Sequence, residues 1–482
     1  MKEITSRALE VARRQGAQYA DIRLVQRRTE SIRVKNKTVQ NVSTGESTGF
    51  GVRVLYDGAW GFASSARLDP AEVEEVTREA VSIARASALV KKGDGVRLSP
   101  VDPAVDTWKS PLKIDPFRVK MEDKIALLLE ATKAMLKEKD VRLAEGSMSF
   151  FAEKKIFAST EGAYIEQEKT ETGAGITATA VAGGEVQRRS YPTSFGGNFA
   201  ARGYEFVEEM HLAEEAERVA REAAELLQAP QAPAGVTDLI LDSSQLALQI
   251  HESCGHPIEL DRVFGQEASF AGTSFLTPEK LGHYRYGSDL VNIRADATLE
   301  GGLGTFGYDD EGVPAQNTPI VEKGIFKNYL SSRETAAELG LTSTGAMRAD
   351  GWNRMPIIRM TNINLDPGDW TLEEIIRDTK EGILMATNKS WSIDDKRLNF
   401  QFGTEIAWEI KDGSLGRMLK NPTYTGITPQ FWGSMDAVAG PEEWTLWGVP
   451  NCGKGEPMQS AHVGHGAAPA RFRKVRVGVG KW

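Results

Sequence analysis

A short segment, residues 251–256, carries two imidazoles and a carboxylate that together could bind and use a metal. Neutral imidazoles are good zinc ligands, and a carboxylate beside a zinc-bound water can act as its general base. The chain has only six histidines, and His251 and His256 are two of them, with Glu252 between. In the familiar zinc-protease pattern the histidines are spaced i and i+4, whereas here the spacing is i and i+5. The segment predicts a zinc site only if local structure brings its histidines together.

The elements around the segment offer a way to do this. Residues 236–241 have the pattern of a strand, residues 242–244 supply candidate N-caps, and residues 245–254 have apolar side chains at helical spacing. On a continuous α-helix the two histidines would point roughly 140° apart. We therefore expect the helix to end at Gly255 in a left-handed cap, so that His256 lies on the exiting turn and swings back.

A candidate third ligand, Cys452, lies far along the chain in a glycine-rich turn that can present a thiol. Nearby Lys454 is placed to favour the thiolate that a metal requires. Two imidazoles and one thiolate leave the fourth tetrahedral position for water, as in catalytic zinc sites. Two alternatives stay open: Cys452 as a small buried apolar residue, and the motif as a helix end with hydrogen-bonded histidines.

Other residues could compete for these roles. His462 and His465 follow Cys452 closely, but the glycines around them indicate a loop or strand with solvated histidines. Cys254 lies inside the motif, where we expect a packed thiol rather than a ligand. Three polar residues of the same half are candidates for a second oxyanion donor: Arg348, Arg354 and Tyr329.

The chain resembles the TldD/PmbA family of metallopeptidases, in the branch that carries the metal motif. The resemblance covers nearly the whole chain and rests on four segments in order: residues 49–63, 251–256, 399–403 and 452–454. It implies that His251, His256 and Cys452 hold the metal and that Glu252 serves the attacking water. It also implies a homodimer, or a heterodimer with a motif-lacking relative, enclosing a cavity that admits only unfolded or short peptides.

Composition limits the remaining possibilities. A net charge of −9 argues against nucleic acid or an anionic membrane as the main partner. Two cysteines in 482 residues exclude a disulfide framework and suggest a reducing compartment. Residues 1–7 lack the apolar core of a signal peptide, and no apolar run approaches the ~20 residues that span a bilayer. These features predict a cytoplasmic protein.

A Pro/Ala-rich connector at residues 229–235 suggests two domains, an N-terminal α+β domain at residues 1–229 and a C-terminal β-rich metallopeptidase domain at residues 235–482. We expect an N-terminal antiparallel sheet with helices on one face, and a mainly antiparallel C-terminal sheet, curled or barrel-like, that carries the metal-site helix. The expected N-terminal helices are residues 2–15, 70–88, 116–138 and 205–227. The expected early strands are residues 20–27, 31–42 and 49–64, the last with a hairpin turn at Asp57-Gly58. After the motif, only residues 333–339 and 372–380 have a helical pattern.

These features predict a zinc-dependent metallopeptidase that hydrolyses unfolded or short peptides with a water activated by Glu252. The main alternative is a non-catalytic metal- or peptide-binding subunit of a hetero-oligomeric protease. A redox protein that pairs Cys254 with Cys452 is disfavoured, because the chain has no CxxC motif.

Overall fold

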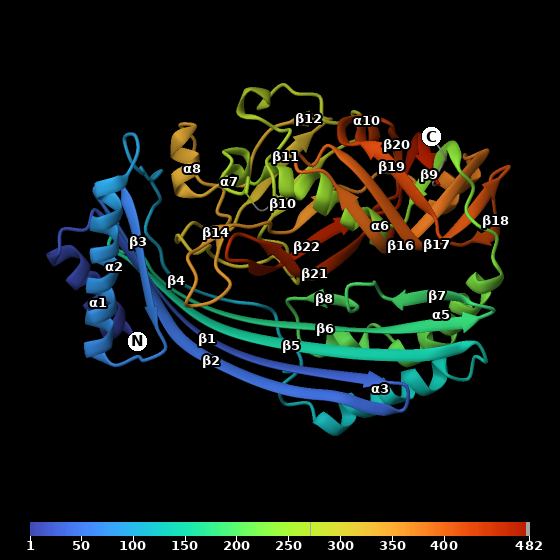
Figure 1. Cartoon of the computed structure of the whole chain (residues 1–482), viewed down its shortest axis with the longest axis horizontal. Helices are drawn as coiled ribbons and strands as arrows, with labels where there is room; N and C mark the ends of the chain where they lie inside the picture. The colour runs from blue at the N-terminus through green and yellow to red at the C-terminus, as the bar shows by residue number, and fades with distance from the viewer. Residues whose placement is uncertain (270, 479–482) are drawn as a thin grey trace.

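The computed structural model describes residues 1–269 and 271–478. Helices and strands mix in both halves of the chain, so the predicted α+β class is confirmed. A long curved sheet from the N-terminal half lies beneath the C-terminal half (Figure 1). No helix of the described residues is long and apolar enough to cross a membrane.

The N-terminal sheet has eight strands in the order β3-β2-β1-β5-β6-β4, with β7 and β8 also paired with β6. All pairs are antiparallel except β4 with β6. The strands are β1 (Tyr19–Lys35), β2 (Thr38–Tyr56), β3 (Ala59–Ser65), β4 (Val105–Lys109), β5 (Val141–Ser159), β6 (Tyr164–Ala182), β7 (Glu185–Tyr191) and β8 (Asn198–Ala200).

The early strands are longer than expected. The predicted breaks at residues 28–30 and 43–48 were wrong, because these polar stretches continue β1 and β2 and pair with each other. The single strand predicted at residues 31–42 was also wrong, because the chain turns back at Asn36-Lys37, where Asn36 has a positive φ of 55°, and Lys35 pairs with Thr38. The hairpin turn predicted at Asp57-Gly58 is confirmed, with positive φ of 43° and 69°.

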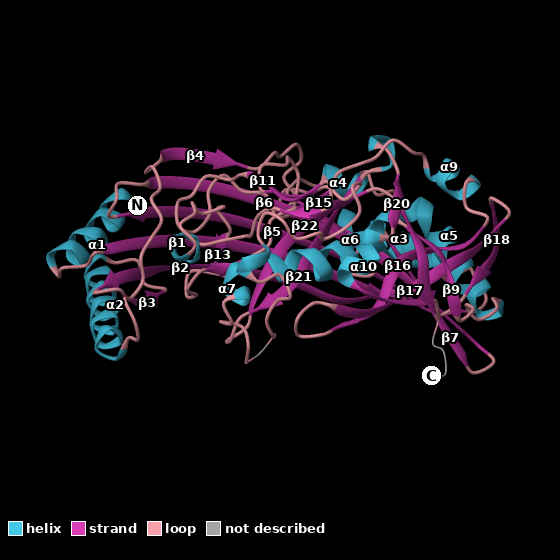
Figure 2. Ribbon diagram, turned by 90° about the horizontal axis from the view of Figure 1, so that it is seen from above, coloured by secondary structure: helices cyan, strands magenta, loops and turns pink. Residues whose placement is uncertain are grey.

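Helices cover the side of this sheet that faces away from the C-terminal half (Figure 1). They are α1 (Lys2–Arg14), α2 (Pro70–Val90), α3 (Met121–Met135), α4 (Glu205–Glu208) and α5 (Leu212–Gln228). The Asp69 side chain caps α2 by accepting from the Glu72 N–H at 3.0 Å. The single helix predicted at residues 205–227 is two helices, because His211 adopts a left-handed φ of 49° between them. Figure 2 shows α1 and α2 at one end of the long sheet.

Five C-terminal strands pair in the ring β16-β9-β23-β19-β17, which β17 closes by pairing with β16. The predicted barrel-like sheet is therefore confirmed. The ring strands are β9 (Gly235–Leu241), β16 (Glu381–Ile393), β17 (Asn399–Lys411), β19 (Thr423–Ile427) and β23 (Ala470–Val477), with β18 (Ser414–Leu419) and β20 (Met435–Val438) attached at its edges.

The other C-terminal strands form smaller sheets beside the ring. One sheet joins β10 (Ile293–Asp296), β11 (Asn317–Glu322), β12 (Ile325–Phe326) and β15 (Ile363–Leu365); the pairs are β13 (Met347–Arg348) with β14 (Ile357–Ile358), and β21 (Thr445–Lys454) with β22 (Gln459–Ala467). The helices are α6 (Ser243–Ile250), α7 (Leu260–Val263), α8 (Arg333–Glu338), α9 (Leu372–Arg377) and α10 (Thr428–Gly433). The expectation of only two helices after the motif was wrong, since the short α7 and α10 also form there.

Candidate metal centre

Helix α6 carries the metal-binding motif into the centre of the C-terminal half. It begins where the Asp242 side chain accepts a hydrogen bond of 2.9 Å from the Ser244 N–H, as the N-cap pattern predicted. All eight residues of α6 are buried, because the helix packs on strands of the ring and on the β21–β22 hairpin. A helix buried on every side holds the side chains at its end in fixed positions.

A π-helical turn, His251–Gly255, follows α6 directly and explains the i, i+5 spacing. Within it the His256 N–H donates to the His251 carbonyl, which is the i→i+5 bond of a π-helix. This wider turn places residues five apart nearly above one another, so both imidazoles project to the same side. The predicted helix end at Gly255 was wrong: Gly255 has a helical φ of −58°, and a 3₁₀ turn (His256–Ile258) continues from it.

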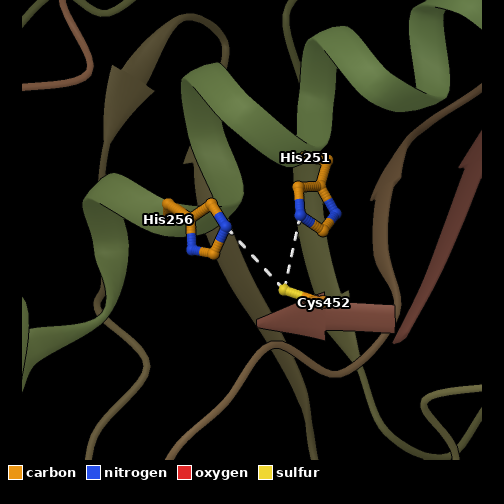
Figure 3. Close-up of side chains that lie close together, drawn as sticks. All are labelled: His251, His256 and Cys452. Atoms are coloured by element: carbon orange, nitrogen blue, oxygen red, sulfur yellow. Dashed lines mark hydrogen bonds between the residues drawn. The ribbon is translucent and has the colours of Figure 1, made fainter. Parts of the chain in front are cut away.

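The side chains of His251, His256 and Cys452 point toward one another (Figure 3). His251 comes from the π-helical turn, His256 from the 3₁₀ turn that follows it, and Cys452 from β21. The Cys452 Sγ lies 3.4 Å from His251 Nε2 and 3.8 Å from His256 Nε2, and all three donor atoms lie within 4.8 Å of one another. Donors that share a tetrahedral zinc ion lie about 3.3–3.6 Å apart, from Zn–N of ~2.0–2.1 Å and Zn–S of ~2.3 Å. The donor set fits a metal ion of this size after small side-chain adjustments.

Burial and charge favour the protonation states that bind metals. Burial lowers the pKa of His251 and lowers that of His256 further, so both imidazoles are neutral at pH 7. Burial by itself raises the pKa of the Cys452 thiol, but Arg359 and His256 outweigh it and the net pKa is lowered. Lys454 does not have the role predicted for it, because its ammonium is buried in ion pairs with carboxylates, the nearest being Asp261 Oδ1 at 2.7 Å.

Each histidine also uses its second ring nitrogen. His256 Nδ1 lies 3.0 Å from Glu259 Oε2, and His251 Nδ1 lies 2.7 Å from His465 Nε2. Such partners fix the tautomer and orientation of a metal-binding histidine. The prediction of a solvated His465 was wrong, since this residue is 0% exposed. His462 is half-buried and contacts Glu171 Oε2 at 2.5 Å, so it is not free in solvent either.

Glu252 does not belong to the group of three donors, but its charge acts on the adjacent His251. It is 5% exposed, and its Oε2 accepts a hydrogen bond of 2.7 Å from Arg397 Nη1. Arg397 comes from the hairpin between β16 and β17, where it adopts a left-handed φ of 62°. Sequence analysis missed Arg397, because in a polar hairpin nothing in its neighbours distinguishes it from a solvated residue.

The remaining sequence candidates lie in other environments. Cys254 is fully buried outside the donor group, as expected for a packed thiol, and burial raises its pKa to about 12. The Tyr329 hydroxyl donates to the Leu276 carbonyl at 2.7 Å. Arg354 lines a separate cavity beside α7, while Arg348 lines a cavity that also includes Arg359.

Known protein families match most of the chain. Residues 20–84 match PmbA/TldA metallopeptidase domain 1, residues 114–229 match the central domain, and residues 234–478 match the C-terminal domain. A metalloprotease of Methanocaldococcus jannaschii is 35% identical over 94% of this chain and 95% of its own length. A zinc metalloprotease TldD homolog of Saccharolobus solfataricus is 22% identical over 96% of this chain and 97% of its own length.

Solved structures share the fold at lower identity. A Thermotoga maritima protein superposes with a TM-score of 0.76 at 19% identity, covering 99% of this chain and 100% of that chain. TldE from Thermococcus kodakarensis gives a TM-score of 0.72 at 18% identity, covering 98% and 99%. Both therefore have the same arrangement of the long sheet and the ring.

Proposed function

Because the chain belongs to the PmbA/TldD family of metallopeptidases, we propose that it hydrolyses peptide bonds with zinc held by His251, His256 and Cys452 and with Glu252 as the general base. The observation that carries this proposal is the convergence of two imidazole nitrogens and one sulfur within 4.8 Å of one another. The complete donor set and the metalloprotease relatives favour this function over a non-catalytic binding subunit.

The chemistry of the donors supports zinc in particular. Imidazole nitrogen and thiolate sulfur suit zinc, whereas magnesium and calcium prefer oxygen ligands. The described residues supply three ligands, and a catalytic zinc site has three protein ligands and one exchangeable position. A bound zinc ion supplies Lewis-acid chemistry, lowering the pKa of water and polarising the scissile carbonyl.

The chain's own residues move the proton. Glu252, whose charge acts on the neighbouring ligand His251, is the residue that accepts a proton from the attacking water and passes it to the leaving amine in this proposal. Arg397 binds Glu252 Oε2 at 2.7 Å and so orients the carboxylate, while no hydrogen bond within the described chain engages Oε1. In this arrangement Arg397 is a positioning residue and Glu252 is the catalytic one.

Burial of the site supports unfolded or short peptides as substrates. His251, Glu252, His256 and Cys452 are each only 4–5% exposed, so a folded protein surface cannot approach them. A single extended chain is narrow enough to enter, and its backbone can pair with strand edges regardless of side chains.

The likeness to TldE supports a heterodimer with a motif-lacking relative, with a homodimer as the alternative. Native mass spectrometry of the protein alone and with such a relative distinguishes the two. The division into domains at residues 1–229 and 235–482 stays a prediction, which limited proteolysis within residues 229–235 tests.

The decisive experiment measures metal content by mass spectrometry and cleavage of an unfolded peptide for wild type, Glu252→Gln and Cys452→Ala. The exposed Glu322→Gln serves as a matched control for the loss of one carboxylate. We expect zinc in wild type and Glu252→Gln, cleavage only in wild type and the control, and loss of zinc in Cys452→Ala. Bound zinc without cleavage by wild type, both alone and with a motif-lacking relative, would favour the non-catalytic alternative. Absence of metal after reconstitution with zinc would refute the proposal.

A further inference from the structure

A cavity of about 250 Å³ lies between the long N-terminal sheet and the β21–β22 hairpin. Residues of β1, β5 and β6 line one side, and residues of β22 line the other. Figure 1 shows the hairpin facing the long sheet across this region. Ala461, one of the lining residues, is the cross-strand partner of Cys452, and Arg359, another, donates to the Cys452 carbonyl, so the cavity lies next to the strand that carries this ligand. Its volume is near the lower end of the roughly 300–1,000 Å³ of small-molecule sites, which suits one side chain or one chain terminus.

Several cations of the cavity wall already have carboxylate partners. Arg27 binds Glu153 at 2.6 Å, and Lys169 binds Glu171 at 2.6 Å. Lys155 is similarly satisfied by a carboxylate at 2.7 Å. In each of these pairs the carboxylate neutralises the cation, so none of the three cations is left unpaired to bind an anionic ligand.

Arg348 and Arg359 differ from these cations, because they hydrogen-bond only to backbone carbonyls. Arg348 donates to the His462 carbonyl at 2.8 Å and to the Met360 carbonyl, and Arg359 donates to the Gln459 carbonyl at 2.8 Å and to the Cys452 carbonyl. In the part of the chain that the structure describes, no carboxylate oxygen lies within 4.0 Å of either guanidinium, and the Nε of each lacks a partner.

Two neighbouring guanidinium groups without a carboxylate partner are electrostatically unfavourable. Arg359 is 1% exposed and Arg348 is half-buried, so water screens them poorly. Burial and the charge of Arg359 lower the pKa of Arg348 to about 10, while Glu171, Asp310 and Cys452 raise it only in part, each acting without a hydrogen bond to the guanidinium. Buried charges in proteins are normally paired or bound to a ligand. A negative group is therefore missing from this side of the cavity.

We propose that the cavity binds a carboxylate of the peptide substrate, with Arg348 as its anchor and Arg359 adding positive potential beside it. The inference rests on the proposed peptidase function and names its substrate class: peptides with a free C-terminal carboxylate or an acidic side chain near the cleaved bond. A guanidinium has five N–H donors in a planar fork that matches a carboxylate. Arg348 uses only two of its nitrogens, Nη1 and Nη2, in bonds to carbonyls, so donors remain for a ligand.

Binding of fluorescent peptides to zinc-loaded Glu252→Gln protein tests this inference without requiring turnover. Four peptides of one sequence combine a free or amidated C-terminus with Glu or Gln at an internal position, so they separate the two sources of the carboxylate. Charge-assisted hydrogen bonds predict that one of the carboxylates tightens binding about 10- to 100-fold over its neutral counterpart. In Arg348→Gln this preference falls to about 1, and in Arg348→Lys it is partly retained.

Arg28→Gln is the matched control, because Arg28 lines the same cavity but is exposed and stacks on the Phe117 ring at 4.5 Å. It removes the same charge and should leave the preference unchanged. Equal binding of all four peptides would overturn the inference, as would an equal loss of preference in Arg28→Gln and Arg348→Gln. Failure of the wild type to hydrolyse peptides would instead contradict the proposed function. The ratios of peptide affinities could still be measured in that case, so the two failures are distinguishable.

Discussion

Removing the imidazole of His465 tests whether this residue sets the tautomer of His251. With Nε2 of His251 directed at Cys452, Nδ1 must carry the proton, and His465 Nε2 at 2.7 Å is its acceptor. His465 in turn can donate from Nδ1 to the Ile363 carbonyl at 3.3 Å, which makes the chain of hydrogen bonds consistent with two neutral rings.

The size of the effect follows from burial. His465→Leu keeps most of the volume but leaves the His251 N–H unsatisfied in a site that excludes water. An unsatisfied buried donor costs about 1–3 kcal/mol, which corresponds to zinc binding about 5- to 150-fold weaker. Loss of such an outer partner typically weakens metal binding by about 10- to 100-fold. The two ranges overlap, so we expect zinc binding to be about 10- to 100-fold weaker.

Competition with a fluorescent zinc chelator at pH 7 measures this affinity directly. His465→Gln, whose carbonyl oxygen can accept from His251, should recover part of the loss, and the exposed His283→Gln controls for removal of a histidine. Zinc affinity unchanged in a folded His465→Leu protein would refute the reasoning. Weakening of the same size in His465→Gln would show that packing rather than the acceptor matters.

Two further predictions concern cysteines and acid stability. Cys254→Ala should retain zinc and peptide cleavage, whereas Cys452→Ala should lose both, because only Cys452 lies with the histidines. Metal content and peptidase activity measure these losses. Equal losses in the two variants would favour a redox pair of the two thiols. Burial raises the pKa of Glu171, but a neighbouring lysine and histidine outweigh it and the net pKa is lowered. Its stabilisation is therefore present above the unfolded value of about 4.3 and is lost as pH falls below it. Glu171→Gln should flatten the acid side of a plot of melting temperature against pH; an unchanged acid side would contradict this.

The sequence was sufficient to predict those helix caps, strands and turns that are specified by residue types close together in the chain. The Asp242 cap, the strand before it and the hairpin at Asp57-Gly58 each depend on residue types within a few positions. The α+β class and the barrel-like C-terminal sheet were also correct. The extents of β1 and β2 were predicted wrongly, with one strand expected across the turn between them and gaps on either side, because strands exposed to solvent lack the apolar alternation that marks a strand in sequence.

The π-helical turn could not be predicted, because residue types do not specify whether a helix closes i→i+4 or i→i+5 bonds. Gly255 suggested a left-handed cap, but its role is close packing: a Cβ there would lie 2.3 Å from Met360 Sδ. The hydrogen-bond partners of Glu252 and His251 could not be predicted from the sequence for a different reason. Arg397 is 145 residues from Glu252, and His465 is 214 residues from His251, so only the folded chain brings them together.

The charges around the metal centre fall into two groups. Glu252 is matched by Arg397 at 2.7 Å, and the buried Glu259 is matched by Lys454 at 3.5 Å and Arg262 at 3.7 Å. These carboxylates have their own cations, so their charges are compensated in a buried site whether or not a ligand is bound. Arg348 and Arg359 have no such partner among the described carboxylates, although they bond to the β21–β22 hairpin that carries Cys452. A carboxylate of a bound peptide would supply the missing partner of Arg348 and Arg359. The affinity for a substrate would then depend on how far its carboxylate lies from the bond that is cleaved.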